Sequence, residues 1–268
     1  MTIIVIAGGL SHERDVSLRS GRRVAQALRD IGREVLETDV NADLVGLLER
    51  TPDPVVVPML HGGLGEDGAL REVLGVLGVP FVGPDGASSR LTFDKSVATP
   101  VVRAAGIETP RQVALPHDIF RDLGAQALME GLGDKIGYPL IVKPARSGSA
   151  LGVTKVTEPA GLPAALVAAY AYGPVAVVES YVDGAEIAVT VLDDGEGPVA
   201  LPAVEIRPVS GVYDYESRYT AGATRFVTPA ELSDETLAAA GELAVAAHNA
   251  LGLRHLSRFD LIVSDGRP

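Results

Sequence analysis

The sequence contains few lysines, and some of them stand where chemistry on an anion would need a positive charge. It has 23 lysines and arginines against 35 aspartates and glutamates, a net charge of −12. Only four of these cations are lysines. Lys143 ends an apolar run and precedes Pro144, a poor place for a lysine that serves only solubility. Lys95 also borders a predicted ordered element. Cations fixed at such points can neutralise the charge of a phosphoryl group.

A glycine- and serine-rich segment, residues 146–152, lies between two predicted strands. Small residues let backbone N–H groups approach phosphate oxygens, and a loop of this kind can close as a lid. Glycine and serine are equally ordinary in a hairpin turn. The residues alone leave both interpretations open.

Arg258 and Asp260 lie two residues apart at the start of an apolar strand, which places them on one face of it. A guanidinium beside a carboxylate there could stabilise an oxyanion next to a metal ion. An exposed ion pair is the alternative.

Residues 63–68 match the GxGxxG pattern of dinucleotide-binding turns, since they follow a predicted strand and precede a predicted helix. However, Glu66 and Asp67 would then meet the pyrophosphate at the helix N-terminus and repel it. We therefore reject the dinucleotide interpretation. The sequence has no GxxxxGK[ST] motif, which also excludes a P-loop nucleotide site.

The composition excludes several kinds of site and several kinds of partner. Without cysteine, the chain has no disulfide, no thiol nucleophile and no thiolate zinc site. The acidic balance argues against nucleic acid as a partner. We find no basic leader and no apolar run of the length that crosses a bilayer, so we expect a cytoplasmic protein without a membrane partner.

The elements that must position these residues change character along the chain. Short strands and helices alternate through the first third, which predicts a parallel sheet covered on both faces. The predicted elements are strands at 3–7, 34–40, 55–60 and 81–82 and helices near 24–31, 43–50 and 69–77. The remainder reads as α+β, with strands at 140–142, 152–156, 175–178, 186–192, 199–206 and 261–263. Its clearest helix follows Ser233, a predicted cap, and ends before Gly252.

Three motifs, in order along the chain, resemble those of the D-alanine–D-alanine ligases of the ATP-grasp superfamily. Residues 61–68 (HGGLGEDG) are similar to the family's HGxxGEDG motif, residues 8–17 to its N-terminal signature, and residues 213–219 (YDYESRY) to its mobile loop. The resemblance covers essentially the whole chain. It implies an α/β fold of ATP-grasp architecture, in which an N-terminal doubly wound parallel sheet is followed by two α+β subdomains that sandwich ATP. The implied domains are 1–92, 93–177 and 178–268.

The resemblance also implies roles for individual residues. On the substrate side, Glu13 would face the ammonium of the first D-alanine, with His61 beside it. A helix-dipole carboxylate and a satisfied loop histidine are the plain alternatives. The residues implied for ATP are Lys95, Lys143, Ser149, Glu179, Val182, Glu186 and Arg218. For these glutamates, surface salt bridges are the alternative.

The resemblance assigns catalysis to four residues, Glu13, Ser149, Tyr219 and Arg258, and metal binding to Asp260. Ser149 would help join the glycine-rich loop to Tyr219 and Glu13, Arg258 would stabilise the oxyanion, and Asp260 would bind Mg²⁺ or Mn²⁺. The chain departs from the family pattern at Arg218, which stands in place of a phosphate-contacting lysine, and at Thr99, Ser147 and Ser180. We expect these changes to lower phosphate affinity.

The family pattern continues after Asp260 with a returning strand that carries a Glu-x-Asn pair. This sequence ends in a turn, residues 265–268, so we expect Asp260 to be the single metal ligand within it. The implied function is ATP-dependent ligation of two D-alanines through an acyl phosphate, by a homodimer. The alternatives are a D-alanyl-D-lactate or D-alanyl-D-serine ligase, and a nucleotide-binding fragment without turnover.

Overall fold

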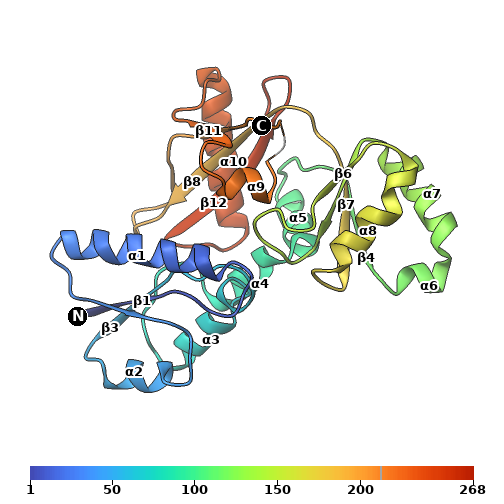
Figure 1. Cartoon of the computed structure of the whole chain (residues 1–268). Helices are drawn as coiled ribbons and strands as arrows, with labels where there is room; N and C mark the ends of the chain where they lie inside the picture. Colours follow the sequence, from blue (N-terminus) through green and yellow to red (C-terminus); the bar gives the residue numbers. More distant parts are fainter. Residues whose placement is uncertain (212) are drawn as a thin grey trace. The chain divides into compact units, whose positions relative to one another are not determined.

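The computed structural model describes residues 1–211 and 213–268, and these form two compact units. Unit 1 consists of Met1–Phe93 together with Asp193–Glu196 and Gly252–Ser257. Unit 2 contains the remainder. Figure 1 shows the chain coloured from the N-terminus in blue to the C-terminus in red. The three-domain division predicted above stays a prediction.

Unit 1 is built on a parallel sheet of strand order β2–β1–β3. The strands are β1 (Thr2–Ile6), β2 (Val35–Thr38) and β3 (Pro54–Pro58). The helices are α1 (Arg14–Asp30), α2 (Leu44–Arg50), α3 (Ala69–Val76) and α4 (Gly86–Phe93), and a 3₁₀ turn, η1, covers Gly63–Gly65. The expected strand at 81–82 is a single parallel bridge between Phe81 and Val56.

Strand β1 is buried along its whole length because helices cover both of its faces. Ile4 and Ile6 pack with residues of α2 and α3, whereas Ile3 and Val5 pack with Ala25 of α1. This alternation follows from the two-residue period of a strand. The parallel, doubly covered sheet predicted from the sequence is confirmed (Figure 1).

The first sheet of unit 2 is antiparallel, in the order β4–β7–β5–β6. The strands are β4 (Gln112–Pro116), β5 (Leu140–Pro144), β6 (Thr154–Val156) and β7 (Val175–Ser180). The helices of this part are α5 (Lys95–Ala104), α6 (Ile119–Leu123), α7 (Ala125–Ile136) and α8 (Leu162–Tyr170), with a 3₁₀ turn, η2, at Pro159–Gly161. Helices α7 and α8 bury one face of this sheet and leave the other face for charged residues (Figure 1).

The second sheet of unit 2 has the order β11–β10–β8–β12, with β9 paired to β8. Its strands are β8 (Ala185–Leu192), β9 (Val199–Ala200), β10 (Val204–Pro208), β11 (Thr224–Val227) and β12 (Leu256–Val263). The helices are α9 (Tyr215–Tyr219) and α10 (Asp234–Ala250), the latter capped by Ser233 Oγ, which accepts from Thr236 N–H at 3.2 Å. The cap is confirmed.

Two expected strands differ from the structure. The stretch 199–206 is two strands, β9 and β10, because Pro202 lies between them and has no N–H for a ladder. Strand β12 begins at Leu256, earlier than the apolar run indicates, because alternate charged residues continue it. Among the described residues, no helix has both the length and the apolar content that a membrane span requires.

Candidate active site

Lys143 and Glu179 form an ion pair on the face of the first sheet opposite its core. Strand β5 buries Leu140 and Val142 beneath α8, so Lys143 points the other way. In the β5–β7 register Lys143 lies opposite Val177, which makes Glu179 its diagonal neighbour. Lys143 Nζ donates to Glu179 Oε1 at 2.5 Å, with the two side chains only 20% and 14% exposed. Lys143 is therefore no solubilising surface group.

The glycine-rich loop is attached to a second lysine. Lys95, at the start of α5, donates from Nζ to the Ser147 carbonyl oxygen at 2.6 Å. Its backbone N–H donates to the Ala145 carbonyl oxygen at 2.9 Å. The loop does join two antiparallel strands, β5 and β6, as a hairpin turn would. The attachment to Lys95 adds a cation that a simple hairpin does not need.

The other side of this loop meets α9. Ser149 Oγ and Tyr219 Oη are 2.5 Å apart and share a hydrogen bond. Ser149 and Ala150 both have positive φ, 52° and 58°, a conformation that costs non-glycine residues energy and persists only where the surroundings impose it. Two residues that are 70 positions apart in the sequence therefore fix the loop together.

Arg218 lies one position before Tyr219 in α9, and its guanidinium carbon stacks 4.1 Å above the ring centre of Tyr213. Its Nε is buried and, within the part of the chain that the structure describes, has no hydrogen-bond acceptor. A buried donor without an acceptor costs free energy, and an incoming anion such as a phosphate would relieve that cost. This residue fits a polyphosphate ligand.

The second sheet presents its own charged face. Glu186 on β8 and Arg258 and Asp260 on β12 alternate with residues that pack into the α10 core, so all three face away from that core. Arg258 donates from Nε to Asp260 Oδ1 at 2.8 Å and from Nη2 to Oδ2 at 3.0 Å. Burial raises the pKa of Glu186, and the charge of Asp260 raises it further. Val182 lies between β7 and β8.

In unit 1, Glu13 and His61 meet through the turns that follow β1 and β3. Glu13 is 5% exposed and immediately precedes α1. Ser11 Oγ donates to the His61 carbonyl oxygen at 2.5 Å and accepts from Glu13 N–H at 3.2 Å. Gly62, at φ 66°, lies so close that a Cβ there would be 2.7 Å from Glu13 Oε2. The His61 ring contacts Ser20 Oγ through Nε2 at 3.2 Å.

Three further residues of unit 1 were missed by the sequence reasoning. Burial raises the pKa of Glu66, and the charge of Glu13 adds to that rise. Arg71 donates from Nη1 to the Gly65 carbonyl oxygen at 2.6 Å and so holds the same turn. Asp39 accepts from Gly9 N–H at 2.7 Å and pairs with Arg14 at 2.7 Å. Glu66 is part of the recognised motif and could have been found there; Asp39 has no sequence signal.

Comparison with known proteins identifies the family of this chain. The family model described as "D-ala D-ala ligase C-terminus" matches residues 101–267. The D-alanine–D-alanine ligase of Moorella thermoacetica is 37% identical to this chain over 267 residues, which cover 100% of this chain and 86% of the relative. The chain belongs to the D-alanine–D-alanine ligase family. The recognition made from three sequence motifs is thereby confirmed.

Solved structures of D-alanine ligases share the fold. The D-alanine–D-alanine ligase from Bacillus anthracis complexed with ATP aligns with a TM-score of 0.82 at 29% identity, covering 100% of this chain and 84% of that one. The VanG D-Ala:D-Ser ligase from Enterococcus faecalis aligns with a TM-score of 0.82 at 28% identity, covering 98% and 86%. The predicted ATP-grasp α/β fold is confirmed.

A divalent metal in this ligase-family chain would have to use few protein ligands. Within the residues that the structure describes, no group of three or more His, Asp or Glu side chains could hold an ion. Asp260 and Glu186 are close enough for the charge of one to raise the pKa of the other. Mg²⁺ commonly takes one or two carboxylates together with substrate phosphates and waters, so the Asp260 carboxylate, which is 39% exposed, fits that mode of binding.

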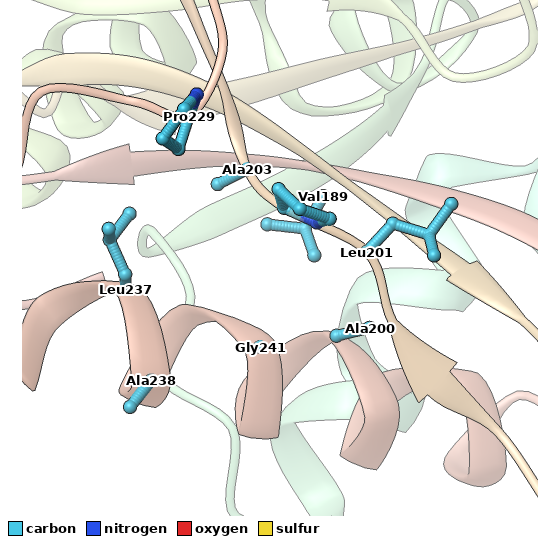
Figure 2. Close-up of a pocket in the computed structure, with 9 residues that line it drawn as sticks. Val189, Ala200, Leu201, Ala203, Pro229, Leu237, Ala238 and Gly241 are labelled. Atoms are coloured by element: carbon cyan, nitrogen blue, oxygen red, sulfur yellow. The ribbon is translucent and has the colours of Figure 1, made fainter. Parts of the chain in front are cut away.

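A hollow in unit 2 lies away from the residues predicted to bind ATP. It has a volume of about 380 Å³ and lies between α10 and the chain around β9 (Figure 2). Val189, Leu201, Pro229 and Leu237 line it together with small apolar residues. These side chains offer no charge to a phosphate, and the predicted site residues lie on the opposite face of β8.

Proposed function

We propose that the protein is an ATP-dependent ligase that joins two D-alanines into D-alanyl-D-alanine, a peptidoglycan precursor, in the cytoplasm. The observation that carries the proposal is the glycine-rich loop of unit 2, held between the Lys95 ammonium and the Tyr219 hydroxyl. It belongs to a chain 37% identical to a D-alanine–D-alanine ligase.

The nucleotide is bound by charged groups of unit 2. Lys95, Lys143 and Arg218 supply positive charge to the phosphates. Glu179 accepts a hydrogen bond from the adenine amine, with the backbone near Val182 beside it, and Glu186 binds the ribose. The Lys143–Glu179 pair supports these roles, because each partner fixes the other's position before the ligand arrives.

The first D-alanine binds at the Glu13 and His61 turns of unit 1. The Glu13 carboxylate pairs with the substrate ammonium, an arrangement that the near-complete burial of Glu13 would strengthen. Glu66 and Arg71 hold the turn in place. The close fit between Gly62 and Glu13 leaves the carboxylate little freedom to turn away.

The reaction proceeds in two steps. A carboxylate oxygen of the first D-alanine attacks the γ-phosphorus, the bond to the β-phosphate oxygen breaks, and ADP leaves. The amine of the second D-alanine then attacks the acyl phosphate carbon, and phosphate leaves as the tetrahedral intermediate collapses and the amine loses a proton. Arg258 stabilises the negative oxygen of that intermediate. The Ser149–Tyr219 bond holds the loop closed, which excludes the water that would hydrolyse an acyl phosphate.

Asp260 would hold Mg²⁺ or Mn²⁺, which when bound would neutralise phosphate charge. Lys95, Lys143 and Arg218 also neutralise phosphate charge. Arg218 in place of a lysine keeps the charge but spreads it over a planar fork.

The proposal is tested with ATP and D-alanine whose carboxylate carries ¹⁸O. An acyl phosphate route transfers one ¹⁸O to the released phosphate for each dipeptide formed. A protein that ATP stabilises against heat, but that releases no phosphate when D-alanine is added, would be the nucleotide-binding fragment instead. D-Lactate and D-serine, offered as second substrates, separate the dipeptide ligase from its relatives.

Two broader features are part of the proposal. We propose three domains, residues 1–92, 93–177 and 178–268, and a homodimer, both supported by the family relationship. Light scattering of the purified protein tests the dimer, and a monomer at micromolar concentration would exclude it.

A further inference from the structure

The contact between Arg258 and Asp260 has a geometry that bears on metal binding. Nε and Nη2 of one guanidinium each donate to a different oxygen of the Asp260 carboxylate. This two-point fork lies along the side of the carboxylate that a metal ion would also use. A cation therefore cannot approach Asp260 from this direction while the fork is in place.

The pair is easily broken and easily remade. Its side chains are 59% and 39% exposed, and exposed pairs are worth little. Both residues lie on β12 two positions apart, so the backbone keeps the partners together whenever the bond opens. The contact is thus reversible without any movement of the fold.

The sheet face that carries the Arg258–Asp260 pair also carries a second carboxylate. Glu186 on β8 faces away from the α10 core, as do Arg258 and Asp260 on β12. The hydroxyl-bearing rings of Tyr213 and Tyr219 lie within electrostatic reach of Arg258. Two carboxylates and the Arg258 guanidinium therefore lie on one sheet face, and the guanidinium bonds one of the two.

We propose that Arg258 is a placeholder cation on Asp260, which a divalent metal displaces, and that this displacement frees the guanidinium for the oxyanion. The inference rests on the proposed function and adds an order of events to it. Oxyanion stabilisation becomes available only after the metal has entered. If acyl transfer began before a metal had bound, Arg258 would still be held by Asp260. The oxyanion would then lack the guanidinium that stabilises it.

The first test compares Mn²⁺ binding to the wild-type protein and its variants by the electron paramagnetic resonance signal of free Mn²⁺. Arg258→Lys keeps the charge but cannot cover both carboxylate oxygens, so we expect it to bind Mn²⁺ about two- to fivefold tighter, the range for loss of an exposed pair. Arg207→Lys is the matched control, because Arg207 makes the same two-point contact with a carboxylate, that of Glu205, outside the site, and its Mn²⁺ affinity should equal that of the wild type. Equal affinity in the wild type and Arg258→Lys would overturn the inference.

Asp260→Asn separates this inference from the proposed function. It should lose Mn²⁺ binding; if it binds Mn²⁺ as the wild type does, Asp260 is not the ligand and the proposed metal placement itself fails. A second readout follows the arginine Nε–H signals by NMR during Mg²⁺ addition. The Arg258 signal should shift, whereas that of Arg207, which donates to Glu205 at 2.7 Å outside the site, should not. Saturation with Mg²⁺ without a shift at Arg258 would also overturn the inference.

Discussion

The two units hold their candidate residues in different ways. In unit 1, Glu13 and His61 are fixed by backbone turns: the space between Gly62 and the Glu13 carboxylate is too small for a Cβ, and Ser11 joins the two turns. In unit 2 the corresponding groups are fixed by side chains from distant segments, such as Ser149 with Tyr219 and Lys95 with the Ser147 carbonyl.

This difference separates a preformed site from an adjustable one. Backbone turns packed against a buried carboxylate change little without local unfolding, which suits recognition of a small ammonium group. Single side-chain hydrogen bonds contribute only about 0.5–1.5 kcal/mol each and can open and close during turnover. Unit 2 therefore has the features expected where a nucleotide must enter and leave. The Lys143–Glu179 pair, mostly buried, is the exception within unit 2.

The largest effect should come from breaking the Lys143–Glu179 ion pair. Lys143→Ala removes a phosphate cation and leaves Glu179 without its ion-pair partner, a change that costs about 3–5 kcal/mol at buried sites. We expect kcat/KM for ATP to fall more than about 100-fold and the melting temperature to drop. The double variant Lys143→Ala/Glu179→Gln should recover the melting temperature but not the activity. If the single variant kept normal turnover, the assignment of Lys143 to ATP would be wrong.

A second change tests whether the unit 1 site is as rigid as its packing indicates. Gly62→Ala would place a methyl group 2.7 Å from Glu13 Oε2, so the carboxylate must move. We expect the KM for the first D-alanine to rise about tenfold or more, since a displacement of this size costs at least one charge-assisted hydrogen bond.

Gly63→Ala is the matched control for that change. Gly63 also has positive φ, 45°, yet apart from its neighbours in the chain no atom that the structure describes lies within 4 Å of its Cβ position. Both variants carry the strain of a left-handed alanine, about 1–2 kcal/mol, but only Gly62→Ala disturbs Glu13. Equal rises in KM for the two variants would show that backbone strain, not the contact with Glu13, sets the effect.

A third change, with a smaller expected effect, loosens the glycine-rich loop of unit 2. Tyr219→Phe removes the hydroxyl bonded to Ser149, and about 0.5–1.5 kcal/mol corresponds to a roughly two- to tenfold loss of dipeptide formation. Phosphate release should fall less than dipeptide formation, because a looser loop admits water to the acyl phosphate. Tyr215→Phe, whose ring centre lies 4.9 Å from that of Tyr219 on the same helix, serves as control. Parallel losses of both products would argue against a water-excluding role.

The sequence allowed the family, the doubly covered parallel sheet and most elements to be predicted, because these depend on periodicity and on short contiguous motifs. It also placed Arg258 and Asp260 on one face of a strand, since alternation decides which side chains lie on the same side.

What the sequence could not give were contacts that depend on register between distant segments. The diagonal pairing of Lys143 with Glu179 follows from the β5–β7 register, and no local pattern encodes that register. Asp39 is another case: it follows β2, yet it accepts from the Gly9 N–H beyond β1 only because the two strands are parallel neighbours. The bidentate bond of Arg258 to Asp260 was foreseeable as an ion pair, but its occupation of both carboxylate oxygens was not.

The smallest expected effect concerns pH and the turn that precedes Glu13. Burial alone would raise the pKa of Asp39, but hydrogen bonds from Gly9, Arg14 and Val40 outweigh burial, so the pKa lies below its ordinary value. A carboxyl with a lowered pKa in the folded state stabilises the protein above its unfolded pKa of about 4, and that contribution disappears as the pH falls through the folded value.

Asp39→Asn retains an oxygen for the Gly9 and Val40 N–H groups but has no charge for Arg14. We expect its melting temperature to lie a few degrees below that of the wild type at pH 7, about the shift for 1 kcal/mol or less in a chain of this size. The two proteins should converge as the pH falls below the lowered pKa of Asp39, where that carboxyl is itself protonated. Glu49→Gln, an exposed carboxylate on α2, should show no such convergence, because it should not differ from the wild type at pH 7. A constant difference between Asp39→Asn and wild type down to pH 2 would mean that the amide disturbs the Gly9 turn sterically, and the unit 1 site would then depend on shape more than on charge.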